Sequence, residues 1–400
     1  MDGPADPEGV SPPEPVVPVE SIASVASVEP VDPVDPAPTP PEVAPAAAWS
    51  PPQPSIYPVS FTGKGSEYFR IWIVNLVLTI LTLGVYSAWA KVRRLQYFYR
   101  HTRLAGSGFD YHGDPIAILR GRMVGLVLFG LYAAISYVQF WVAVAILASL
   151  ALVMPWLVSR SLKFRLHNSS YRGIRFRFNG SAPSAYWVFL ALPIFTVLSL
   201  FLLGPLWHHR IKRYQFANAA YGRTPFTFRA EVGDFYVTYV VAVAAMMAFM
   251  FTLFIGIVII GVVAALANGP VAAPETPSMP PGFLIIFIAG YVLAILTVQS
   301  ITASRIQNTV WNTSRLGSHG FICEIRWFKL FGIALTNLLA TVLTLGLFRP
   351  FAQVRLARYL AGAIVMTPSG PLDNLLAAET EDVSAVGEEA VGFFDLDVGF

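Results

Sequence analysis

Long apolar stretches alternate with short basic stretches over most of this chain. Six apolar runs are long enough for membrane insertion: 69–90, 123–158, 186–207, 235–267, 283–303 and 328–348. About 20 apolar residues span a hydrocarbon core of roughly 30 Å. The run 123–158 therefore predicts two short helices with a turn near Ser136–Gln139. The run 235–267 exceeds one span and predicts a helix that tilts, protrudes or bends near Gly256 and Gly261.

The basic residues indicate which side of the membrane each loop occupies. All 27 Lys and Arg residues lie in six short stretches: 64–70, 91–122, 160–177, 210–229, 305–329 and 349–358. The loop 268–282 contains none. Because basic loops stay on the cytoplasmic side, the six stretches are predicted to be cytoplasmic and 268–282 to lie outside.

Two apolar runs, 186–207 and 328–348, have a basic stretch at both ends. A single crossing would place one of those stretches outside, whereas a re-entrant hairpin keeps both inside, and membranes tolerate such backbone where protein covers it. Turn sequences occur at Leu83-Gly84, Leu203-Gly204-Pro205 and Leu345-Gly346. We therefore favour re-entrant hairpins at 69–90, 186–207 and 328–350, with full spans that violate the charge rule as the alternative.

An internal repeat connects three of the runs. Residues 75–84 and 337–346 are identical at seven of ten positions, and the similarity continues as far as Tyr97 and Tyr359. A weaker copy aligns Leu203-Gly204 with the first turn if one residue is deleted. Each copy is predicted to contain a membrane hairpin, a basic amphipathic helix and a short strand.

Short strands are indicated by residues that alternate beside glycine. The pairs are Val59/Phe61, Phe109/Tyr111, Phe176/Phe178 and Phe226/Phe228, and Gly63, Gly113 and Gly180 follow three of them. The segments 168–173 and 312–317 also resemble each other. The predicted fold is an all-α polytopic membrane protein, built from internal repeats, with small cytoplasmic β elements.

Composition supports a membrane protein with polar tails. Hydrophobic residues make up 55% of the chain and charged residues 13%, compared with about 25% charged residues in soluble domains. Residues 1–57 are rich in Pro, Ala and Glu and lack Lys and Arg, and 367–400 is acidic, so both are predicted to be disordered tails around a membrane domain at 58–366. The single Cys323 excludes an intramolecular disulfide and is expected to be a buried small residue.

Two stretches resemble a known family. Leu83–Arg93 (LGVYSAWAKVR) and Gly108–Gly113 (GFDYHG) look like the YjgN-like family of bacterial inner-membrane proteins, and the resemblance runs from about Val59 to Met366. It implies a polytopic inner-membrane protein whose biochemical function is not established. It carries over no catalytic or binding residues. The family often has Pro where Ala88 stands.

Two sets of residues are candidate sites. The first is basic and could contact anionic lipid headgroups, to which each Lys or Arg contributes about 1 kcal/mol; the alternative is an anchor that only sets topology. Its members are Lys91, Arg93, Arg94, Lys212, Arg213 and Arg355. The second set, Asn75 and Asn337, occupies equivalent repeat positions and could line a polar intramembrane site, as in broken-helix transporters. The alternative for these two is hydrogen bonding between helices, worth about 0.6 kcal/mol each.

Other functional classes lack a signal. No ionisable residue interrupts the interiors of the apolar runs, which disfavours a proton-coupled pump. Adjacent residues on a helix point about 100° apart, so His208-His209 is a poor metal site. We expect no enzyme, cofactor, metal or nucleic-acid partner, and no protein partner is indicated. The two functions left open are a transporter or channel for a small solute, and a membrane-organising protein that binds anionic lipids at the cytoplasmic face of the bacterial inner membrane.

Overall fold

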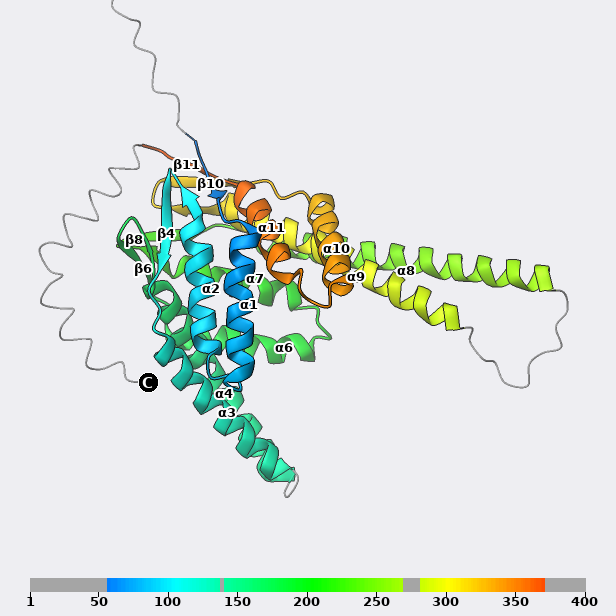
Figure 1. Ribbon diagram of the computed structural model, residues 1–400, viewed down its shortest axis with the longest axis horizontal. Helices are drawn as coiled ribbons and strands as arrows, with labels where there is room; N and C mark the ends of the chain where they lie inside the picture. Colours follow the sequence, from blue (N-terminus) through cyan, green and yellow to red (C-terminus); the bar gives the residue numbers. More distant parts are fainter. Residues whose placement is uncertain (1–55, 137–139, 269–280, 371–400) are drawn as a thin grey trace, which may run out of the picture. The chain divides into compact units, whose positions relative to one another are not determined.

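The computed structural model describes residues 56–136, 140–268 and 281–370 (Figure 1). These residues belong to one compact unit that starts at Pro52. The predicted tails lie almost entirely outside the described residues, as do most of the loop 268–282 and of the predicted turn near Ser136–Gln139. The described part contains helices and short strands that recur in the same order five times along the chain.

Eleven short strands form one antiparallel sheet whose order closes on itself. The order is β1-β11-β10-β9-β8-β7-β6-β5-β4-β3-β2. Its two ends, β1 (Tyr57–Pro58) and β2 (Ser60–Phe61), are consecutive in the chain. Val59 lies between them and donates its N–H to the carbonyl of Ile364 at 3.0 Å. The sheet is therefore a ring, and the prediction of an all-α fold with small β elements is corrected to a mostly helical chain with a large closed sheet.

The remaining strands pair as hairpins around the ring. They are β3 (Thr102–Leu104), β4 (Ser107–Tyr111), β5 (Ser169–Tyr171), β6 (Ile174–Phe178), β7 (Ala219–Tyr221), β8 (Thr224–Phe228), β9 (Ser314–Leu316), β10 (His319–Cys323) and β11 (Ile364–Thr367). The turns at Ala105-Gly106 and Arg172-Gly173 have positive φ at both central residues, which is the type I′ geometry that suits a twisted hairpin. β11 and β1 pair at Met366 and Tyr57, so the two ends of the folded chain replace a fifth hairpin.

Between successive hairpins the chain leaves the strand ring in one helical segment and returns to it in a second. We call the outgoing segment the descending helix and the returning segment the ascending helix. We call each such excursion a repeat. Repeat 1 contains α1 (Gly65–Leu81) and α2 (Ser87–His101); repeat 2, α3 (Pro115–Ser136) and α4 (Phe140–His167); repeat 3, α5 (Ala182–Tyr186), the π-helix η1 (Trp187–Ala191), α6 (Leu192–Leu198) and α7 (Gly204–Ala217); repeat 4, α8 (Val232–Asn268) and α9 (Pro281–Thr313); repeat 5, α10 (Trp327–Leu343) and α11 (Arg349–Gly362). Each helix contacts the next one along the chain, and α11 contacts α1, so the helices also close into a ring.

All five repeats share one strand register. In each, the last residue of the outgoing strand pairs with the first residue of the returning strand: Phe61 with Thr102, Tyr111 with Ser169, Phe178 with Ala219, Phe228 with Ser314, and Cys323 with Ile364. The three copies predicted from sequence are repeats 1, 3 and 5. They align throughout without a gap, so the deleted residue in the middle copy is corrected.

Long and short repeats alternate. Repeats 2 and 4 supply the four helices that are long and apolar enough to cross a membrane: Pro115–Ala134, Phe140–His167, Val232–Val263 and Leu284–Thr313. Repeats 1, 3 and 5 are short helical hairpins, and both ends of each lie on the strand ring. The helical hairpins are thus as predicted, and their entry into the membrane from the cytoplasmic side, which would satisfy the charge rule, stays a prediction. α8 is one continuous helix through Gly256 and Gly261.

The hairpin turns correct one predicted position. In repeat 1 the turn is at Leu83 (φ 49°) and Gly84 (φ 94°), where the Gly84 N–H donates to the Thr79 carbonyl at 2.7 Å. Repeat 5 turns in the same way. In repeat 3 the turn is at Leu200-Phe201, with φ values of 52° and 66°, and not at Leu203-Gly204. Sequence missed it because φ > 0 is uncommon for residues other than glycine.

The interior of the strand ring is filled. The third residue of each returning strand contributes to one buried cluster: Leu104, Tyr171, Tyr221, Leu316 and Met366. Residues at another set of equivalent positions pack against it: Val59, Phe109, Phe176, Phe226 and Phe321. The Tyr171 hydroxyl donates to the Leu104 carbonyl at 2.7 Å, and the Tyr221 hydroxyl to the Tyr171 carbonyl at 2.9 Å. Side chains that meet inside a closed sheet form a core and not a channel.

Candidate membrane-boundary site

An arginine occupies the same position on every ascending helix. It lies nine residues before the first residue of the returning strand, and the five members are Arg93, Arg160, Arg210, Arg305 and Arg355. We call this set the arginine belt. Nine helical residues rise by about 13 Å. The shared register therefore places the five arginines at similar depths below the strand ring.

Two members of the belt locate the membrane boundary. Arg160 and Arg305 are the first charged residues after the apolar stretches of α4 and α9, where a cytoplasmic boundary is expected. The equivalent arginines of repeats 1, 3 and 5 are then expected at the same boundary. Their helices, α2, α7 and α11, begin six residues earlier, which is about 9 Å deeper. We therefore expect the short hairpins to enter only one leaflet, whose hydrocarbon layer is about 15 Å thick.

The tips of the short hairpins carry uncovered apolar side chains. Leu83 is 96% exposed, Leu345 is 95% exposed and Leu200 is 85% exposed. Such leucines gain free energy when they leave water for acyl chains, at roughly 25 cal/mol per Å² of buried apolar surface. The tips therefore fit insertion into the cytoplasmic leaflet.

This topology predicts a labelling pattern. We expect Leu83→Cys and Leu345→Cys to react with a lipid-soluble maleimide and not with a membrane-impermeant maleimide added from outside, because the tips stop within the inner leaflet. Glu275→Cys, in the loop predicted to lie outside, serves as the positive control. Labelling of either tip by the impermeant reagent from outside would contradict the half-inserted hairpins.

The native cysteine does not interfere with that measurement. Cys323 is 1% exposed, and burial raises the pKa of its thiol to about 11. The reactive thiolate is therefore scarce at pH 7.5 and increases only as pH rises toward 11. We expect the unmodified protein to stay unlabelled at pH 7.5 and to react after denaturation.

The belt arginines differ in what they contact. The Arg355 Nη1 atom donates to the Thr336 hydroxyl at 2.7 Å and to the Asn337 Oδ1 atom at 3.5 Å. The guanidinium groups of Arg93 and Arg160 each lie 5.7 Å from an aromatic centroid, that of Tyr86 or Trp156. A guanidinium over a ring keeps its N–H edge available for a second partner. No ion pair among the described residues involves a belt arginine.

The other predicted lipid contacts separate into two groups. Lys91, Arg94 and Arg213 are exposed, whereas Lys212 is half-buried, and burial lowers the pKa of its ammonium group. Lys91 and Arg94 lie on α2 near the belt. Of these four residues Lys212 is the least accessible to a headgroup, because it alone is half-buried.

The histidine pair connects two helices. The His208 Nδ1 atom lies 3.0 Å from the Tyr239 hydroxyl, and the His209 Nε2 atom donates to the Ala230 carbonyl at 2.9 Å. Burial, with a smaller effect of Lys212, lowers the pKa of His208 to about 4. The His208 imidazole is therefore neutral at physiological pH, and burial also lowers the pKa of His209. The two contacts hold α7 against the start of repeat 4. Within the described ranges no cluster of His, Cys, Asp or Glu could hold a metal ion.

The two asparagines have different surroundings. The Asn337 Nδ2 atom donates to the Ala352 carbonyl at 3.3 Å, which links α10 to α11. Asn75 is 7% exposed, and its Oδ1 atom has no hydrogen-bond partner in the described part of the chain. No hydrogen bond joins the two side chains there. The structure thus supports a helix-linking role for Asn337, and the shared polar site stays a prediction.

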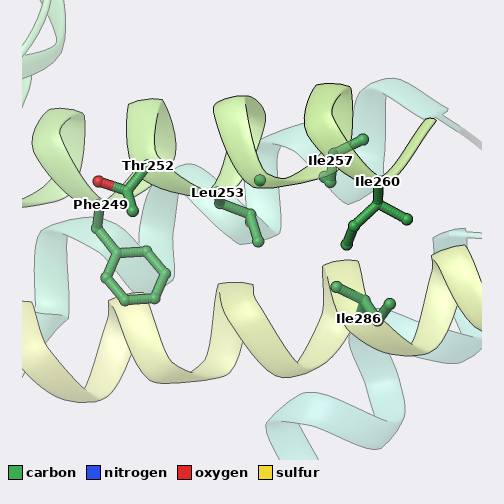
Figure 2. Close-up of a pocket in the computed structure, with 7 residues that line it drawn as sticks. Phe249, Thr252, Leu253, Ile257, Ile260 and Ile286 are labelled. Carbon is green, nitrogen blue, oxygen red and sulfur yellow. The ribbon is translucent and has the colours of Figure 1, made fainter. Parts of the chain in front are cut away.

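Two cavities of about 290 Å³ lie along α8 and α9, and neither is lined by Asn75 or Asn337. The first is a groove among apolar side chains such as Leu253, Ile257 and Ile286 (Figure 2). Its one hydroxyl, on Thr252, donates to the Ala248 carbonyl of its own helix at 2.9 Å. The second cavity lies at the level of the belt and is lined by Arg305, Asp234, Val237, Thr238, Asn308 and Thr309.

Comparison with known proteins identifies the family of the chain. Residues 56–393 match the family described as "Bacterial protein of unknown function (DUF898)". The chain belongs to this family. The inner membrane protein YjgN of Salmonella typhimurium (strain LT2) is 28% identical over 146 residues, which is 36% of each chain. YjgN of Escherichia coli (strain K12) is 29% identical over 153 residues, which is 35% of each.

The aligned region spans only about a third of the length of these relatives. No solved structure matches the chain. The predicted resemblance to the YjgN-like family and the predicted inner-membrane location are confirmed, and the four candidate spans agree with them.

Only part of the belt was predicted from the sequence. Arg93 and Arg355 were predicted lipid contacts, whereas Arg160, Arg210 and Arg305 were not. Arg160 and Arg305 lie in repeats 2 and 4, whose long apolar helices match nothing in repeats 1, 3 and 5. A search for arginine nine residues before each predicted returning strand would have found all five.

Proposed function

We propose that this DUF898 protein is a non-enzymatic, membrane-organising protein that binds anionic lipids at the cytoplasmic face of the inner membrane. One observation carries the proposal: five arginines occur at one register position, at the level where the apolar stretches of α4 and α9 end. None of the ion pairs in the described residues neutralises them. A lipid phosphate accepts hydrogen bonds from guanidinium in a bidentate manner, so anionic headgroups complement the belt.

The short hairpins support the same function. Their apolar tips insert beside the lipids whose headgroups reach the belt, so each combines an apolar anchor with a cation. An apolar anchor combined with a cationic group is typical of proteins that bind to a membrane surface. The net positive charge strengthens the attraction to anionic headgroups, because the described residues include all 27 basic residues and only six acidic ones.

Transport, the other function that the sequence suggested, has less support. The interior of the strand ring is packed with aromatic and aliphatic side chains. The groove between α8 and α9 offers a solute almost no polar contact. Lipid binding is therefore the function that the geometry favours.

The proposal predicts weaker lipid binding when belt charge is removed. We expect Arg160→Gln with Arg305→Gln to reduce the affinity of the purified full-length protein for short-chain phosphatidylglycerol about 30-fold, since each cation contributes about 1 kcal/mol. Affinity is measured by titration in a mild detergent or by native mass spectrometry. Added salt should weaken binding of the unmodified protein, because ions screen exposed charges.

A matched pair controls for net charge. Arg103→Gln with Arg315→Gln removes the same charge from exposed positions on the strand ring, about 17 Å from the belt level. This exceeds the Debye length of about 8 Å at physiological salt, so the control should bind normally. Equal losses in both double variants, or no loss in the belt variant, would refute the proposal.

A further inference from the structure

A second group of cations lies where repeats 1 and 2 meet. Ser87, Lys91 and Arg94 follow one another on α2 at spacings of four and three residues, so their side chains share one helix face. Helix α3 packs against α2. The Nη1 atom of Arg122, from α3, donates to the Ser87 hydroxyl. This bond places the Arg122 guanidinium about one helical turn from Lys91.

The fourth cation is Arg165, from α4, which packs against α3. The Lys91 residue is exposed overall, but partial desolvation of its ammonium group lowers the pKa of that group, and three guanidinium groups lower it further: Arg122, Arg94 and Arg165. We call these four residues the junction cluster. Like charges at close range oppose one another, so an assembly of this kind loses free energy unless an anion compensates it.

No carboxylate of the described residues compensates the junction cluster. Glu67 lies within ion-pair distance of Lys64 and His101, and Asp110 pairs with Arg100. Asp114 accepts hydrogen bonds from the backbone N–H groups of Ile116 and Ala117 at the start of α3. The cluster is therefore open to an external anion.

The position of the cluster points to the source of that anion. Lys91 and Arg94 flank the belt residue Arg93 on α2, at the membrane boundary. A single phosphodiester carries one negative charge and would leave most of the cluster uncompensated. Two phosphates on one headgroup match four cations better, and guanidinium is well suited to phosphate.

We propose that Lys91, Arg94, Arg122 and Arg165 form a binding site for a lipid headgroup that carries two phosphate groups. The inference rests on the proposed function and deepens it, because it assigns a specific lipid class to one junction of the helix ring. Of the four residues, Arg122 and Arg165 are neither belt members nor residues that the sequence analysis selected.

The test compares lipids with one and two phosphates on the purified full-length protein. Cardiolipin has two phosphodiester groups and phosphatidylglycerol has one, and affinity is measured in mixed micelles with phosphatidylcholine as the neutral lipid. We expect the unmodified protein to prefer cardiolipin. Arg122→Gln with Arg165→Gln should weaken cardiolipin binding about 30-fold and phosphatidylglycerol binding far less, since two cations at about fivefold each are lost. Arg122→Lys with Arg165→Lys should keep most of the preference.

The outcomes separate this inference from the proposed function. Equal affinity of the unmodified protein for cardiolipin and phosphatidylglycerol, or an unchanged preference in the Gln variant, overturns the junction site and leaves lipid binding by the belt intact. No preference of the unmodified protein for either anionic lipid over phosphatidylcholine overturns the proposed function itself.

Two further arms address the source of the phosphate and folding. Inorganic pyrophosphate that binds as tightly as cardiolipin and displaces it would show a site for a soluble anion and overturn the lipid assignment. The thermal midpoint of the Gln variant should match that of Arg103→Gln with Arg315→Gln. If the Gln variant does not fold, the Lys variant decides: loss of its cardiolipin preference overturns the proposal, and retention supports it.

Discussion

Replacement of Tyr221 by alanine is expected to lower the free energy of unfolding by about 4 kcal/mol, in the range for truncation of a buried aromatic side chain. Tyr221 is 1% exposed and packs inside the strand ring with Tyr171 and Phe176, whose ring centroids lie 6.1 and 5.2 Å away. Its hydroxyl donates to the Tyr171 carbonyl at 2.9 Å. Loss of the aromatic ring of Tyr221 leaves a cavity in the buried cluster to which all five returning strands contribute.

Two further variants separate packing from hydrogen bonding. Tyr221→Phe keeps the ring and should cost about 1 kcal/mol, the typical net value of one hydrogen bond. Tyr291→Ala truncates a tyrosine of α9 that is 49% exposed and should have a small effect. The measurement is denaturant or thermal unfolding of the purified protein in detergent. If Tyr221→Ala unfolds no more easily than Tyr291→Ala, the filled ring is not a stabilising core.

Replacement of Gly113 by isoleucine is expected to destabilise the protein by about 3 kcal/mol, and a second change should restore much of the loss. A Cβ atom on Gly113 would lie 2.5 Å from both the Cε1 atom and the hydroxyl of Tyr111. Tyr111 is 2% exposed, so the ring has no room to move. Overpacking of this kind typically costs 1–3 kcal/mol.

Repeat 5 shows the compensating arrangement. At the equivalent positions it has Cys323 and Ile325, which are 1% and 4% exposed; a small residue at the strand end leaves space for the larger one. Tyr111→Cys alone should also destabilise, because it leaves a cavity. The double variant Tyr111→Cys with Gly113→Ile should be at least 2 kcal/mol more stable than the sum of the two single effects predicts, a coupling expected of side chains in contact. Additive losses in unfolding experiments would show that the two positions do not share one space.

The same pair of positions shows which strands a local sequence pattern can predict and which it misses. The aromatic residues at 61, 111 and 178 and the glycines two residues later were visible as a pattern and correctly predicted short strands. Cys323 and Ile325 fill the equivalent space with the volumes exchanged, so that strand keeps Phe321 but lacks the second aromatic residue and the following glycine. Local patterns therefore undercounted the repeats and the strands.

The amino-acid sequence by itself determined the membrane class, the helical hairpins and the family, and it predicts the cytoplasmic placement of the basic stretches, because each follows from composition, charge or short-range similarity. Only the tertiary structure decided that β1 and β11 close the strand ring, that repeats 2 and 4 share the register of repeats 1, 3 and 5, and that five arginines reach one depth. The physical reason is that strand register is a long-range property: Cys323 pairs with Ile364 across a whole helical hairpin, and hydrogen bonds between distant segments leave no periodic mark in either segment. From the sequence alone the basic residues predict only a cytoplasmic side, whereas the shared strand register places five of them at the same number of residues from the strand ring.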